Sequence, residues 1–197
     1  MNWIKAILSA LLFCVLATAG SLTYTEQGNL SGSLGGTPFT NALVTFTVAG
    51  TPSSIHSSGD QFWDVFLGGS ATVAIAGIPG TATITNVAEV AAWQCTSSCV
   101  DPAAGIGFDS GGVYMVLITL NPLFGTYDLT TPIGPLSGDA VGTAPNLDTD
   151  KGLFVISHYD GGTSTFTAST DTPEPGSLGL LAGAAALLLA AGRRLAR

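Results

Sequence analysis

The sequence predicts an all-β domain, either a sandwich of the jelly-roll or immunoglobulin-like kind or a barrel. Only 9% of the 197 residues are charged, against about 25% in ordinary soluble domains, and 26 are glycine. Threonine alternates with apolar residues in several short segments, which is the period of a half-buried strand. Turn residues recur about every 8–12 positions, a spacing typical of sandwiches and barrels.

Four segments alternate in this way, and two others are more continuously apolar, which suits the centre of a sheet. The alternating segments are residues 45–48, 72–75, 81–85 and 165–168, and the apolar ones are residues 62–67 and 113–120. Turn signals stand at residues 35–36, 49–52, 68–69, 79–80, 111–112 and 161–162. No segment before residue 176 has a clear helical period, although residues 86–93 could form one helical turn.

Large apolar side chains within these segments are the predicted core, and about 150 residues suffice to bury one. The candidates are Phe46, Trp63, Phe66, Ile75, Ile84, Trp93, Val116, Ile118, Phe154 and Phe166.

Charge is distributed unevenly along the chain. Four of the five basic residues lie near the two ends, and residues 20–172 contain twelve acids and the single basic residue Lys151. This balance argues against nucleic-acid binding, which needs clustered Lys and Arg to neutralise phosphates. It fits a solvated acidic surface, or else divalent cations.

The N-terminus has the three parts of a secretory signal peptide. Lys5 gives a short positive start, residues 6–17 are almost wholly apolar, and small residues stand at Ala17 and Ala19. Cleavage is expected after Ala19, so that residues 1–19 are removed. The alternative, a buried core helix, lacks any amphipathic pattern.

The C-terminus, residues 172–197, has three parts in a fixed order. Pro173, Glu174 and Pro175 break regular structure, residues 178–191 are apolar or glycine, and the chain closes on a basic end. The basic end consists of Arg193, Arg194 and Arg197. A helix over residues 178–191 would be about 21 Å long, whereas a bilayer core is about 30 Å thick. The tail is therefore short for a permanent anchor, and its arginines are expected on the cytoplasmic side.

This tripartite end resembles the PEP-CTERM sorting signal of exported proteins from Gram-negative bacteria that make exopolysaccharide. The resemblance implies processing by an exosortase, a membrane transpeptidase, and exopolysaccharide as a further partner. It also implies a path through the inner membrane, with the domain outside, to the cell surface or the extracellular space. The alternative is a plain single-span anchor with a proline-rich spacer.

Cys95 and Cys99 are the cysteine pair that remains after signal removal. In an exported protein they are expected to form a disulfide that closes a small loop. A metal site would need further soft ligands, and the only histidines are His56 and His158. A redox-active pair is the other alternative, but no basic residue lies nearby to lower a thiol pKa.

No catalytic residue is assigned, and neither a metal nor a cofactor is expected. A Gly-x-Ser-x-Gly nucleophile elbow is absent. His158 and Asp160 are close in sequence, but neighbouring strand residues point to opposite faces, which argues against a joint role. A glycosidase needs two carboxylates facing one cleft, and Asp60, Asp64, Asp109 and Asp160 are the candidates.

Residues 146–152 resemble the start of a calcium loop, although the glycine falls one place late and no closing Glu follows. The other interpretation is a turn in which the Asx side chains bond the backbone.

The expected function is a non-enzymatic structural or adhesive role of residues 20–171 in exopolysaccharide or biofilm, which the PEP-CTERM resemblance implies. The alternative is a carbohydrate-binding or carbohydrate-active β-sandwich.

Overall fold

The structure is a computed structural model that describes residues 21–50, 55–57, 62–67, 71–94, 101–109 and 113–170. For residues 62–67, 109 and 113 only the backbone is described. Several predicted site residues lie outside the described residues. They are Ala17 and Ala19 of the signal peptide, the pair Cys95 and Cys99, and the whole tail from Asp171, including Pro173, Glu174, Pro175, Arg193, Arg194 and Arg197.

The described chain is almost entirely β, which confirms the all-β part of the prediction. The first strands are β1 (Leu22–Leu34), β2 (Thr37–Gly50), β3 (Ile55–Ser57), β4 (Phe62–Leu67), β5 (Ala71–Ile75) and β6 (Ala82–Ile84). The others are β7 (Ala88–Trp93), β8 (Ala103–Asp109), β9 (Val113–Leu120), β10 (Ile133–Val141), β11 (Asn146–Leu147) and β12 (Phe154–Thr170), with one short 3-10 helix, η2 (Pro122–Thr126).

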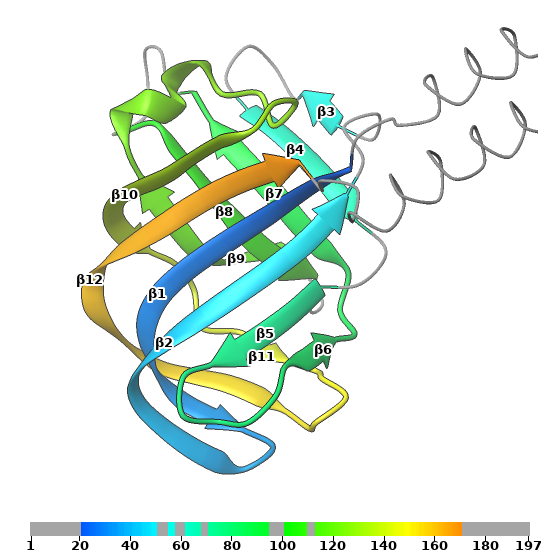
Figure 1. Cartoon of the computed structure of the whole chain (residues 1–197), viewed down its shortest axis with the longest axis vertical. Helices are drawn as coiled ribbons and strands as arrows, with labels where there is room; N and C mark the ends of the chain where they lie inside the picture. The colour runs from blue at the N-terminus through cyan, green and yellow to red at the C-terminus, as the bar shows by residue number, and fades with distance from the viewer. Residues whose placement is uncertain are drawn as a thin grey trace, which may run out of the picture.

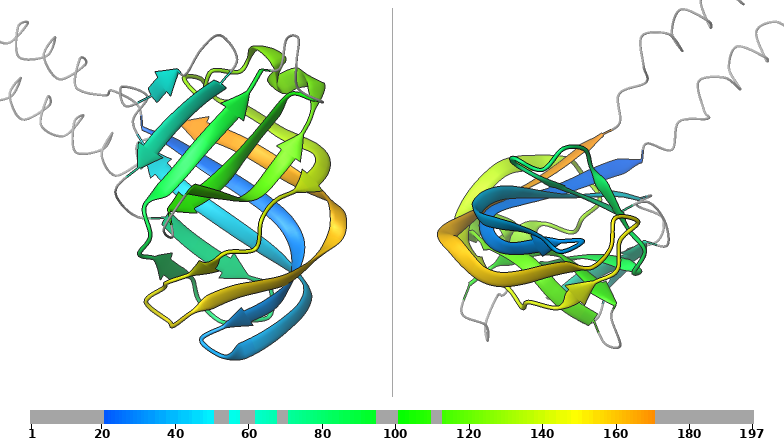
Figure 2. Two further views of the ribbon diagram at one scale, coloured as in Figure 1. Left: turned by 180° about the vertical axis from the view of Figure 1, so that it is seen from behind. Right: turned by 90° about the horizontal axis from the view of Figure 1, so that it is seen from below.

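The strands form one antiparallel sheet that curls into a half-barrel. Its order is β3-β4-β7-β8-β9-β10-β12-β1-β2-β5-β6, and β11 pairs with β12 off this path. One wall contains β12, β1, β2 and β5, and the opposite wall contains β4, β7, β8 and β9 (Figure 1). Figure 2 shows the curl from behind and from below. The apolar faces of the two walls therefore meet inside a single sheet.

The edge strand β6 is covered by a segment near the start of β12. Ile84 forms a bridge with Thr149, and the backbone N–H of Asp150 donates to Thr83 O at 3.0 Å. The Asp150 carboxylate accepts the backbone N–H of Thr83 at 2.8 Å. Because β11 pairs with β12 just before this segment, hydrogen bonds continue from β6 back to β12 at this end of the sheet. This contact satisfies backbone groups that an open edge would leave free for another chain.

Strand β1 shows why the alternation predicts burial. Residues 22, 24, 26, 28 and 30 are buried, whereas residues 23, 25, 27 and 29, which alternate with them, are partly exposed. The pairing of β1 with β12 is interrupted between Gly28 and Leu30, where β12 jumps from Ser164 to Tyr159. The glycines at 161 and 162, which the sequence pattern places in a turn, therefore lie in an irregularity inside β12.

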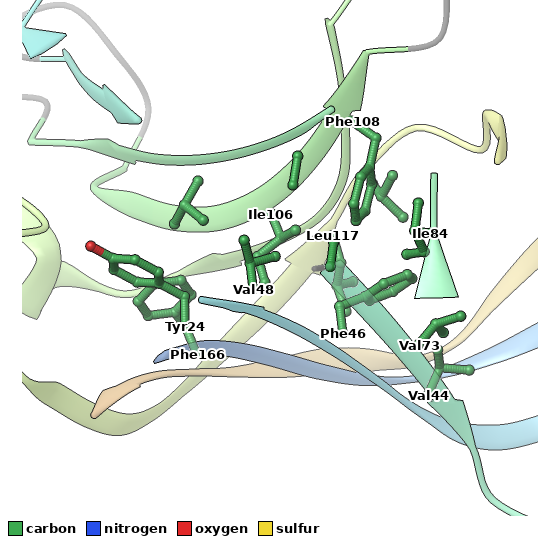
Figure 3. Close-up of a cluster of buried hydrophobic side chains, with 14 of the residues drawn as sticks. Tyr24, Val44, Phe46, Val48, Val73, Ile84, Ile106, Phe108, Leu117 and Phe166 are labelled. Carbon is green, nitrogen blue, oxygen red and sulfur yellow. The ribbon is translucent and has the colours of Figure 1, made fainter. Parts of the chain in front are cut away.

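The core lies between the two walls (Figure 3). Phe46 from β2 contacts Phe108 from β8, with ring centroids 6.0 Å apart, and meets Phe154 edge-on at 5.8 Å. Six of the ten predicted core residues are buried: Phe46, Ile75, Ile84, Val116, Phe154 and Phe166. Trp93 and Ile118 are only partly buried, and the side chains of Trp63 and Phe66 lie outside the described part.

One prediction of local structure was wrong. Residues 86–93 do not form a helical turn, because 88–93 is the central strand β7, paired with β4 and β8. Strand pairing on both sides outweighs the weak helical preference of a short segment rich in alanine and glutamate. In the part of the chain that the structure describes, no helix is both long enough and apolar enough to cross a membrane.

Candidate functional site

A shallow hollow of about 440 Å³ lies where β9 meets the segment between β10 and β11. Its lining residues are Tyr114, Thr143, Ala144, Pro145 and Asn146. Tyr114 is 42% exposed, and its backbone is fixed opposite the buried Phe108 of β8. The volume falls in the range of about 300–1,000 Å³ that small-ligand pockets occupy.

The far wall of the hollow is held rigidly against β9. The backbone N–H and the hydroxyl of Thr143 both donate to Met115 O, at 2.8 and 3.0 Å. The Tyr159 hydroxyl lies within hydrogen-bonding distance of Val116 O (2.8 Å) and Thr143 O (2.5 Å). Burial raises the pKa of Tyr159 to about 12, so this phenol remains a donor throughout the neutral range.

Gly142 allows this close approach. A Cβ at this position would lie 2.2 Å from Val116 O, closer than any side chain permits. Glycine is therefore required for the segment to lie flat on β9. The site is formed before any ligand arrives, which lowers the entropic cost of binding.

The chemistry of the hollow suits binding rather than catalysis. Tyr114 offers an exposed ring, while the side chains of Thr143 and Asn146 offer hydroxyl and amide groups. Its lining includes no carboxylate, so these five residues do not supply the acid pair of a glycosidase. Of the four candidate acids, only the Asp160 side chain is described, since Asp60, Asp64 and Asp109 have no described side chain.

Asp160 belongs to a different cluster, beside the irregularity in β12. Ser31 Oγ donates to Asp160 Oδ2 at 2.5 Å, and His158 Nε2 lies 3.9 Å from Asp160 Oδ1. The expectation that His158 and Asp160 point to opposite faces was wrong, because residues two apart in a strand share a face. A serine hydrolase nevertheless needs the imidazole between the serine and the acid. Here the acid lies between them, so this cluster is not a catalytic triad.

The calcium-like segment of residues 146–152 binds the sheet instead of presenting its oxygens together. Asp150 accepts the Thr83 backbone N–H, as above, and the Asn86 side chain accepts the backbone N–H of Asp148 at 2.8 Å. Lys151 Nζ donates to Pro79 O at 3.2 Å. Within the described ranges no group of three His, Cys, Asp or Glu side chains could hold a metal ion.

Sequence reasoning missed a buried acid, Glu26. It points inward from β1 and is fully buried, with Oε1 2.5 Å from Thr119 Oγ1 of β9. Thr119 Oγ1 lies 2.7 Å from Ser164 Oγ, which in turn donates to Ile118 O at 3.1 Å. Oε2 has no hydrogen-bond partner among the described groups. The alternation of Leu22, Tyr24 and Leu30 is the signal that places residue 26 on the inner face.

The burial of Glu26 favours its protonated form. Burial raises its pKa well above the ordinary value, and the bonds to Thr119 and Ser164 lower it by less. A serine hydroxyl carries one hydrogen, and Ser164 gives its own to Ile118 O. Thr119 in turn donates to Glu26 Oε1, and either form of the carboxyl can accept this bond. Ionisation would leave a buried charge whose second oxygen, Oε2, has no partner among the described groups, so burial favours the neutral form.

No protein-family model, no curated protein sequence and no solved structure matches this chain.

Proposed function

We propose that the chain is exported and held at the membrane by its C-terminal tail until that tail is processed. Residues 20–171 would then have a structural or adhesive role in an extracellular polysaccharide matrix, with no catalytic role. Residues 1–19 would act as the signal peptide, and residues 172–197 as the sorting signal and transmembrane helix that an exosortase removes.

The observation that carries this proposal is the pairing of the two ends of the domain. Leu22 at the start of β1 lies opposite Thr170 at the end of β12. Both ends therefore leave the sheet at one place, and the β1–β2 turn at Gly35 and Gly36 lies at the other end of β1 (Figure 1). A tail that follows Thr170 would hold the domain by one end and turn the rest of its surface outward.

Mass spectrometry of the mature protein tests the export and processing. The full chain is produced in a bacterium that has an exosortase, and the envelope and matrix fractions are digested. We expect mature peptides that begin at Gly20 and none from residues 178–197. Recovery of those tail peptides from the matrix fraction would show that the tail is retained and would contradict processing.

The hollow at Tyr114 favours carbohydrate binding as a second candidate function. A sugar can stack its C–H face on an exposed tyrosine ring, while Thr143 and Asn146 bond its hydroxyls. A glycan array with the purified chain tests this. Tyr114→Ala should abolish any signal, whereas Leu123→Ala, which shortens an exposed side chain in η2, should leave it unchanged. Equal signals for the two variants would exclude the hollow as the binding site.

A further inference from the structure

The outer face of β12, β1, β2, β5 and β6 carries a row of threonines, one from each of five neighbouring strands. The register aligns Thr83 with Thr72, Thr72 with Thr47, Thr47 with Thr25, and Thr25 with Thr167. These side chains point outward, because Tyr24, Phe46 and Phe166, one position away in their strands, are buried.

Two further rows flank this one, and together the three rows are called the threonine face. The second row contains Ala74, Thr45, Gln27, Thr165 and Ser137, and the third contains Ala49, Thr23 and Ser169. Neighbouring strands are about 4.8 Å apart, and alternate residues of one strand are about 6.7 Å apart. The threonine face is therefore a two-dimensional grid of hydroxyl and methyl groups.

The grid holds its groups in fixed positions. Threonine is branched at Cβ, so its hydroxyl and methyl occupy few rotamers and lose little entropy on contact. In the second row, Gln27 Nε2 donates to Thr45 Oγ1 at 3.0 Å, and Ser137 Oγ lies 2.7 Å from Thr165 Oγ1. Within the described residues, the hydroxyls of the central row make no side-chain hydrogen bond, which leaves them available to solvent or to a ligand.

The composition of the face restricts what it can bind. Although the chain has a formal net charge of −8, none of the residues in the three rows is charged. None is aromatic, so the face lacks the ring on which a sugar would stack, in contrast to the hollow at Tyr114. The occupant that fits is neutral, extended and able to accept and donate hydrogen bonds on a regular repeat.

We propose that the threonine face binds ice. A crystal surface of ice offers water molecules that repeat in two directions, at spacings comparable to those between strands and between alternate residues. Threonine hydroxyls can bond these waters, and the methyl groups between them restrict the orientation of the waters that they touch. Adjacent strands twist by about 20–25°, so we expect a planar surface to contact a few neighbouring strands, here β2, β1 and β12. Those three strands carry Thr45, Thr47, Thr23, Thr25, Thr165 and Thr167.

Inhibition of ice recrystallisation tests this assignment. The probe is polycrystalline ice in sucrose solution, held just below its melting point, with the purified full chain added. We expect the chain to keep the grains small and Thr47→Lys, at the centre of the grid, to need an about tenfold higher concentration. The matched control is Leu153→Lys, which adds the same charge at an exposed position before β12, at the opposite end of that strand from Thr165 and Thr167. Thr47→Gln, which lengthens the side chain without charge, is the second variant in case Thr47→Lys fails to fold by circular dichroism.

Three results would overturn the proposal. One is growth of ice grains at the buffer rate in the presence of the unaltered chain. Another is an equal loss of inhibition in Thr47→Lys and Leu153→Lys. In the third, the unaltered chain binds an insoluble neutral polysaccharide or a second copy of itself, and Thr47→Lys abolishes that binding without changing ice growth. None of these results bears on tail processing or on the Tyr114 hollow, which have their own tests.

Discussion

Replacing Glu26 with glutamine should remove a pH dependence from the stability of this fold. Glu26 is fully buried between β1 and β9, and burial raises its pKa above the ordinary 4.5. A raised folded pKa means that the folded protein holds this proton more tightly than the unfolded chain does. Its contribution to stability is therefore complete below pH 4.5 and declines as the pH rises from 4.5 through the folded pKa.

The size of the effect follows from the linkage of one proton. Within this window, each pH unit lowers the free energy of unfolding by up to about 1.4 kcal/mol, so two units remove about 2.7 kcal/mol. Glutamine has nearly the same shape, can accept the Thr119 hydroxyl at its amide oxygen, and does not titrate. The variant should match or fall slightly below the unaltered chain at pH 4.5, and exceed it increasingly as the pH rises.

Urea denaturation followed by tryptophan fluorescence, at pH steps upward from 4.5, measures both curves. The difference between the two proteins isolates the contribution of Glu26, because every other titrating group is shared. Parallel curves for the two proteins over the whole range would refute the reasoning, since they would mean that residue 26 binds no extra proton on folding. Thr119→Val is a useful companion, because it removes the hydroxyl that links Glu26 to Ser164.

Three other variants have outcomes that follow from the described contacts. Phe46→Ala should lower the free energy of unfolding by about 3–5 kcal/mol, because it empties the centre of the core; a loss below about 1 kcal/mol in urea denaturation would place the core elsewhere. Tyr24→Phe should cost about 1 kcal/mol, because it deletes the 2.8 Å bond from the hydroxyl to Leu129 O. Burial raises the pKa of Tyr24 to about 12, so stability should fall as the pH rises from 10 through 12, and this fall should be smaller in Tyr24→Phe. Asp150→Ala should speed hydrogen exchange at the Thr83 amide, which it bonds, and leave exchange in β8 unchanged.

The strands that the sequence predicts best are those with a single strong pattern. Residues 62–67 and 113–120 are strands over the whole predicted length, because a mostly apolar run next to glycine leaves few alternatives. Strand β1 was not predicted, since Glu26, Gly28 and the polar residues around them weaken its alternation. Strand β10 was also missed, because it contains glycine and proline, residues that usually end strands.

The candidate site could not be predicted from the sequence to the same extent as the strands. Tyr114 lies in an apolar segment that favours burial, and its exposure depends on the packing of residues 143–146 against β9. That contact joins segments about thirty positions apart through backbone hydrogen bonds, which leave no periodic trace in the sequence. The threonines are visible as alternation, but their alignment across five strands depends on register, which a single sequence does not contain.

The side-by-side ends of β1 and β12 also determine how the domain would respond to force. Leu22 and Thr170 are the last pair of an antiparallel ladder, so pulling the two ends apart would load their hydrogen bonds one after another, as in opening a zipper. A domain loaded in this way resists little, because only one pair carries the force at a time. If the N-terminus is free and only the segment after Thr170 is attached, tension does not act across the ladder at all. Attachment by a single end would thus protect a fold that attachment by both ends would open.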